Sequence, residues 1–117
     1  MAYSELLADR VRRVFTEKRT ANVEEKRMMS GITFMVNDKM CVGVVNDELM
    51  ARIDRTWHEE AITLNGCRTM IHGGRSMIGY VFVSPEGIDA DDDLDFWIQK
   101  ALDFNPRATA SKKKKIT

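Results

Sequence analysis

Three aspartates at alternate positions are the residues of this sequence that most suggest a metal site. Asp89, Asp91 and Asp93 follow the spacing of the first ligands of a calcium-binding loop. Such a loop also requires glycine at its sixth position and a bidentate glutamate at its twelfth, and these positions hold Leu94 and Lys100. We therefore predict that the aspartates begin a helix, because carboxylates there complement the positive end of the helix dipole.

The histidines and cysteines are the candidates for zinc binding or nucleophilic catalysis. His58 and Glu59 match the start of a metalloprotease zinc helix, but the second histidine expected four residues on is Ile62. Cys67 beside His58 or His72 would pair a nucleophile with a base, yet nothing in the sequence supplies the third group that orients the base. The sequence therefore predicts no metal, no cofactor and no catalytic residues, and we expect a protein that is not an enzyme.

A glycine-rich segment, Gly73-Gly74-Arg75-Ser76, offers backbone amides and one guanidinium to an anion. Phosphate-binding loops normally lead into the N-terminus of a helix, whereas this segment leads into a predicted strand. We therefore favour a hairpin turn over a phosphate site.

A lysine run near the C-terminus is the candidate contact for nucleic acid or another polyanion, and it consists of Lys112, Lys113, Lys114 and Lys115. The run also balances the chain, because 18 basic and 18 acidic residues give zero formal charge and residues 1–111 alone carry −4. A mildly acidic body argues against a domain built chiefly to grip phosphate backbones. A solubilising tail is the alternative role of the run.

Composition places the chain among small globular proteins. Of 117 residues, 44% are hydrophobic and 31% are charged, unlike a disordered or collagen-like sequence. No apolar stretch approaches the ~20 residues that cross a bilayer, and the N-terminus lacks the apolar core of a signal peptide. Two cysteines beside eight methionines suggest a reducing compartment. We expect a cytoplasmic protein that does not associate with membranes.

Apolar stripes predict a helix at each end of the folded region. Ser4 is the expected N-cap of the first helix, and Asn105-Pro106 ends the last. The stripes consist of Leu7, Val11, Val14 and Phe15 in the first helix, and of Leu94, Trp97, Ile98, Ala101 and Leu102 in the last. A short helix over about residues 56–64 is expected from Thr56 and Glu59, which have capping-box spacing.

Five strands are predicted between these helices, over about residues 28–36, 40–45, 49–53, 69–72 and 77–84. Two-residue turns at Asn37-Asp38 and Asn46-Asp47 join the first three strands as an antiparallel meander. The predicted order is α-β-β-β-α-β-β-α, an α+β fold in which helices pack on one face of a five-stranded antiparallel sheet to give two layers. We expect one domain over residues 1–106 and a disordered basic tail over residues 107–117.

The second strand is expected to be apolar on both faces. Val42 and Val44 point one way and Cys41 and Val45 the other, because side chains alternate along a strand. We therefore predict that one face of the sheet is covered by a partner or by a second copy of the chain.

Short motifs also recur in a definite order, namely Lys26-Arg27-Met28-Met29-Ser30-Gly31, Asn37-Asp38-Lys39-Met40, residues 47–54, Met77-Ile78-Gly79-Tyr80, and Trp97 with Ala101-Leu102. Their order and spacing resemble the N-terminal domain of TfoX, the bacterial regulator of competence genes, over about residues 12–104. The resemblance implies the same α+β fold and offers no catalytic residues. The family-motif positions are Arg27, Met28, Gly31, Arg52, Met77, Gly79 and Tyr80. Where the family commonly has an aromatic residue and paired glycines, this chain has Met29 and Ser30-Gly31.

The resemblance and the lack of a catalytic constellation favour a small protein that acts by binding, in transcriptional or competence-related regulation. Among the family-motif positions, Arg27 and Arg52 are the polar candidates for a contact, with an ordinary strand-edge salt bridge as the alternative role. The alternative function is a homo-oligomeric protein-interaction module with no nucleic-acid role. Direct nucleic-acid binding would depend on the lysine run and on the basic first helix.

Overall fold

The computed structural model describes residues 3–28 and 31–108. Its helices are α1 (Glu5–Glu17), α2 (His58–Ala61), α3 (Pro85–Ile88) and α4 (Asp91–Phe104), with the 3-10 turns η1 (Arg55–Trp57) and η2 (Asn105–Arg107). Its strands are β1 (Val23–Met28), β2 (Gly31–Val36), β3 (Lys39–Val45), β4 (Glu48–Arg52), β5 (Cys67–His72) and β6 (Arg75–Val83). No helix in the described part of the chain is long and apolar enough to cross a bilayer.

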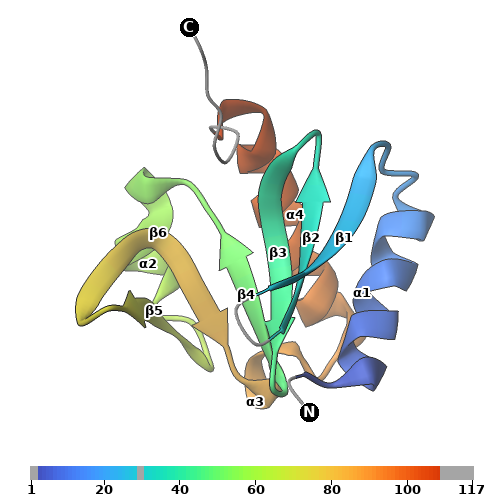
Figure 1. The fold of residues 1–117 in the computed structure, drawn as a ribbon. Coiled ribbons are helices and arrows are strands. Elements are labelled where there is room, and N and C mark those ends of the chain that lie inside the picture. The colour runs from blue at the N-terminus through green and yellow to red at the C-terminus, as the bar shows by residue number, and fades with distance from the viewer. Residues whose placement is uncertain (1–2, 29–30, 109–117) are drawn as a thin grey trace, which may run out of the picture.

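The strands form one antiparallel sheet in the order β1-β2-β3-β4-β6-β5. Figure 1 shows β1, β2 and β3 standing side by side, while the β5–β6 hairpin projects away from them. The register skips three residues of β6 between its pairings with Thr69 and Met70 of β5, so the hairpin carries a bulge where β6 bends. The sheet is therefore strongly bent on its β5 side.

Helices α1 and α4 pack against each other on one side of the sheet (Figure 1). The predicted stripes of both helices are buried there, together with alternate residues of the strands such as Phe34, Val44 and Val81. The hydroxyl of Ser4 accepts a hydrogen bond from the N–H of Leu7, which confirms the predicted N-cap. The buried stripes thus form one continuous core between a helical layer and a sheet.

The prediction of five strands is wrong, because the sheet has six. Strand β1 escapes the hydrophobic pattern since it lies at the sheet edge and exposes its charged residues from Glu24 to Arg27. The predicted strand over residues 28–36 instead spans the end of β1 and the whole of β2, which pair as a hairpin. An exposed edge strand needs no apolar alternation, and only its pairing with β2 reveals it.

The helical segments between and after the strands also differ from the prediction. Residues 56–64 contain only η1 and the single turn α2, and the cap is Asp54, whose carboxylate accepts hydrogen bonds from the N–H and hydroxyl of Thr56. An additional turn, α3, begins at Pro85, which suits the first position of a helix. The acidic first turn predicted for the last helix is confirmed, because α4 begins with three aspartates.

The turns of the meander follow the prediction, whereas the alternation along its second strand does not. Asn37, Asp38 and Asn46 have positive φ angles of 54°, 65° and 55°, which asparagine and aspartate tolerate. Cys41 is skipped in the pairing of β2 with β3 and belongs to the buried core. The bulge at that point therefore removes Cys41 from the face of Val45, where simple alternation had placed it.

Candidate functional site

Two family-motif glycines hold the backbone in positions that other residues would not tolerate. A Cβ at Gly31 would lie 2.2 Å from the carbonyl oxygen of Val44. Gly79 has φ +95° at the β6 bulge, and its carbonyl accepts a hydrogen bond from the N–H of Ile53 over 2.8 Å. Both positions therefore shape the sheet.

The two family-motif arginines contact aromatic rings. The Arg27 guanidinium lies 5.9 Å from the ring centre of Tyr3. That of Arg52 lies 5.4 Å from the ring of Tyr80 on the neighbouring strand and 5.9 Å from that of Phe104 at the end of α4. Arg27 forms no ion pair within residues 3–28 and 31–108, so the expected strand-edge salt bridge is not its role there.

The remaining sequence-predicted positions are only partly placed. Met77 is half-buried and pairs with Met70 of β5. The backbone of Met28 ends β1 opposite Gly31. The lysine run, Lys112 to Lys115, lies outside the described residues.

The cysteines do not form a nucleophilic centre. Burial raises the pKa of Cys67 to about 11 and that of Cys41 to about 12, so both thiols stay protonated at neutral pH. The ring of His58 forms its hydrogen bonds with Gly79 and Thr69 and not with a cysteine, and His72 is exposed at the tip of the β5–β6 hairpin. Within the described ranges, no three His, Cys, Asp or Glu side chains gather as metal ligands would.

His58 is the one buried histidine, and both of its ring nitrogens are engaged. It is 2% exposed. Its Nδ1 accepts a hydrogen bond from the N–H of Gly79 over 2.9 Å, so the ring proton belongs on Nε2, which lies 3.0 Å from the hydroxyl of Thr69. Burial lowers the pKa of His58, with the charge of nearby Arg55 adding to the effect and Glu59 opposing it. The neutral ring therefore links α2 to the β5–β6 hairpin through two hydrogen bonds.

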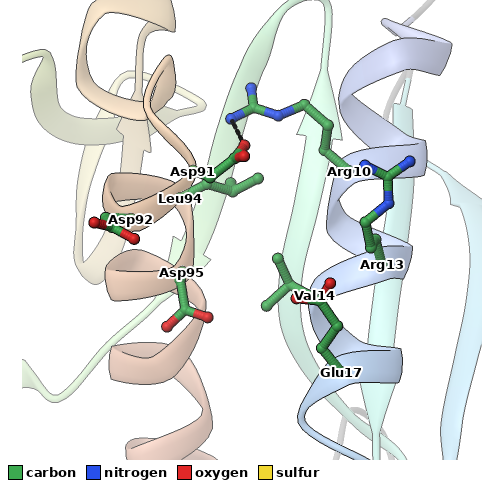
Figure 2. Close-up of a pocket in the computed structure, with 8 residues that line it drawn as sticks. All are labelled: Arg10, Arg13, Val14, Glu17, Asp91, Asp92, Leu94 and Asp95. Atoms are coloured by element: carbon green, nitrogen blue, oxygen red, sulfur yellow. Dashed lines mark hydrogen bonds and ion pairs between the residues drawn. The ribbon is translucent and has the colours of Figure 1, made fainter.

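A charged cleft separates α1 from α4 (Figure 2). Arg10 spans it, donating hydrogen bonds to the Asp91 carboxylate over 3.2 Å and to the carbonyl oxygen of Ile88 over 2.9 Å. Farther along, Lys18 donates to Asp95 over 3.0 Å and to Gln99 over 2.7 Å. The hydrogen bonds and ion pairs of Arg10 and Lys18 therefore hold the α4 region against α1 across the cleft.

Ion pairs with carboxylates neutralise much of the positive charge on α1. Besides Arg10 and Lys18, Arg12 binds the carboxylates of Asp9 and Glu25, and the pKa of its guanidinium is raised chiefly by its hydrogen bond to Glu25. These ion pairs reduce the free charge that α1 offers to phosphates.

The sheet face opposite these helices carries a row of side chains that runs across all six strands. The pairings that align it are Lys26 with Thr33, Thr33 with Gly43, Gly43 with Met50, Met50 with Phe82, and Phe82 with Arg68. The ends of the row are cationic and its middle is mainly apolar. We call this side of the sheet the row face.

A hollow lies over the middle of the row. Its lining consists of Thr33, Gly43, Val45, Met50, Met70, Ile71, His72 and Phe82. It encloses about 180 Å³, and the absence of a side chain at Gly43 contributes room, because a Cβ there would lie 3.1 Å from the terminal methyl of Met50. Ile71 at its edge is 59% exposed, a large apolar side chain that faces solvent beside an apolar concavity.

Two polar side chains flank the apolar middle of this row. At one end, Arg68 lies 5.2 Å from the ring centre of Phe82 and grips Glu48 through two hydrogen bonds of 2.7 Å. On the other side of the middle, next to Lys26, Thr33 is 3% exposed, and its hydroxyl forms no hydrogen bond within the part of the chain that the structure describes. Buried hydroxyls are normally satisfied, so Thr33 is an exception that needs explaining.

Comparison with protein families identifies the chain. The profile of the TfoX N-terminal domain matches residues 17–105, about three-quarters of the sequence. The chain belongs to the TfoX N-terminal domain family. No curated protein and no solved structure matches it in the other two comparisons.

This membership confirms the family predicted from the short motifs. The matched region begins at the last residue of α1, so this TfoX N-terminal domain is matched over its whole sheet, α2, α3 and α4. The family is a regulatory, non-enzymatic one, and membership in it suggests a competence-regulator-like protein.

Sequence reasoning missed the row face of this TfoX N-terminal domain. Its members come from six strands and have no common local pattern, and one of the strands was not predicted at all. There were two local hints. Val45, which the sequence placed on an apolar face, lines the hollow, and Gly43 is a glycine inside an apolar strand, which often marks a place where another group approaches the backbone.

Proposed function

We propose that this TfoX N-terminal domain acts without catalysis, by binding a protein partner through its row face in transcriptional or competence-related regulation. The observation that carries the proposal is the apolar hollow with the exposed Ile71 at its edge, on the side of the sheet away from α1 and α4. Apolar concavities edged by polar residues are typical of contact surfaces.

The test uses two exposed apolar residues on different surfaces. Ile71 lines the hollow over the row face, and Leu6, which is 74% exposed, lies on α1 outside the matched region. Affinity capture from the native host, with nuclease added, should retain a protein partner with the wild type and with Leu6→Lys but lose it with Ile71→Lys. Equal retention by Ile71→Lys would place the contact elsewhere and contradict the proposal.

A homo-oligomeric module is the alternative, with the row faces of two copies in contact. A C2 contact would bring the exposed Ile71 of each copy toward the hollow of the other. Sedimentation equilibrium should then show a dimer that Ile71→Lys converts to monomer. A strict monomer at high concentration would eliminate this alternative and leave the protein partner.

Direct nucleic-acid binding is the third proposal, and it depends on the lysine run because much of the charge of α1 is paired. Removing residues 111–117 should weaken binding and flatten its dependence on salt. Unchanged affinity and salt slope would show that the run is not a phosphate clamp.

A further inference from the structure

The Thr33 hydroxyl, which has no hydrogen-bond partner among the described residues, points to a ligand more specific than a general apolar contact. A buried polar group without a partner costs about 1–3 kcal/mol, and a ligand that supplies the missing partner recovers that cost on binding. Thr33 lines the hollow, so a molecule inside the hollow is placed to supply it.

The charge next to Thr33 favours an anionic group. Lys26 stands directly across the β1–β2 ladder from Thr33, on the row face, and forms no ion pair among the described residues. Side chains paired in this way have Cβ atoms about 5 Å apart, within reach of a lysine. Glu24 is the nearest carboxylate on that face of β1, and it stands opposite Met35, two pairs farther along the ladder.

The rest of the hollow suits a short apolar chain. Met50 and Met70 are buried and flexible, and Val45, Ile71 and Phe82 complete an apolar wall. A volume of about 180 Å³ corresponds to about six water molecules at ~30 Å³ each, so the hollow takes the carboxylate end of a short chain and leaves the far end of an eight-carbon chain outside.

We propose that the hollow binds a small amphipathic carboxylate, with its chain between Met50, Met70 and Phe82 and its carboxylate between the Thr33 hydroxyl and Lys26. The Thr33 hydroxyl donates a hydrogen bond to the carboxylate, and Lys26 supplies the opposite charge. This site does not depend on the protein partner proposed above, because the isolated domain suffices to test it.

The experiment is a titration of the isotope-labelled full chain near neutral pH, followed by backbone amide shifts, with three probes of equal chain length. Octanoate should give saturable shifts at Thr33, Gly43, Met50 and Phe82. Octan-1-ol should bind more weakly, and octylammonium should not bind. Absence of saturable octanoate shifts, shifts confined to other surfaces, or equal binding of all three probes would overturn the proposal.

Three variants assign the roles. Thr33→Val keeps the shape and removes the hydroxyl, so octanoate should bind roughly tenfold more weakly while octan-1-ol changes less. Lys26→Gln should weaken octanoate about two- to fivefold, a loss that high salt abolishes. Arg27→Gln removes the same charge from the opposite face of β1 and should leave binding unchanged. Octanoate affinity that is unchanged in both Thr33→Val and Lys26→Gln would refute the site even if the protein partner is confirmed.

Discussion

Mild acidification should lower the free energy of unfolding of this domain through one residue, His58. Its folded-state pKa is lowered, so as the pH falls the unfolded chain takes up the proton first. His58 therefore contributes its full stability above its ordinary pKa near 6.5 and loses it progressively as the pH falls below that value. Protonation in the folded state would place a hydrogen on Nδ1, which faces the N–H of Gly79.

The size of the effect has an upper limit. One proton changes the free energy of unfolding by at most about 1.4 kcal/mol per pH unit. If the folded ring stays neutral, the wild type loses at most about 2 kcal/mol between roughly pH 7.5 and 5. Asp54, whose pKa is lowered to about 2 mainly by hydrogen bonds from Thr56, contributes only at lower pH.

The assay is urea unfolding followed by the fluorescence of Trp57 and Trp97, measured across that pH range. His58→Phe should be about 1–3 kcal/mol less stable at neutral pH, because the buried N–H of Gly79 loses its acceptor, and its stability should not change with pH. His72→Gln, at the exposed hairpin tip, is the matched control and should keep the wild-type slope. A wild type without slope, or a slope that persists in His58→Phe, would refute the reasoning.

Two further predictions concern the backbone and the thiols. Gly31→Ala should lower the free energy of unfolding by about 2–3 kcal/mol, because its Cβ would meet the backbone oxygen of Val44. Gly74→Ala has open space but φ +78°, so it should lower the free energy of unfolding by only about 1–2 kcal/mol. Similar urea midpoints for the two variants would contradict this prediction. Cys67 should react with a disulfide reagent at neutral pH far more slowly than in the urea-unfolded chain, since its raised pKa cuts the thiolate fraction roughly 100-fold. Rapid labelling of Cys67 in the folded protein would show that the thiol is not held protonated.

Local patterns in the sequence predicted the helices and strands whose side chains pack into the hydrophobic core. The stripe from Leu7 to Phe15 and the Ser4 cap fixed α1, because helical periodicity and capping depend on residues within a few positions of each other. The turn at Asn37-Asp38 was equally readable, since left-handed backbone angles restrict the residues that adopt them.

Strand β1 could not be predicted in this way. Its charged residues from Glu24 to Arg27 are exposed, and an edge strand with exposed residues has no required alternation. The prediction of a short helix over residues 56–64 was wrong for the opposite reason, because a local signal was present but the structure did not follow it. Its capping-box spacing was present, but Asp54 provided the cap and the helical turn ended at Ala61.

The sequence by itself determined the family, the two amphipathic helices and most of the strands, because each of these depends on short motifs and local periodicity. Tertiary structure alone decided the row from Lys26 to Arg68, the hollow and the burial of Thr33 beside it. The physical reason is register. Neighbours across a sheet are set by turn lengths and bulges, such as the one at Cys41, and shifting the register of a strand by one residue would send its side chains to the other face.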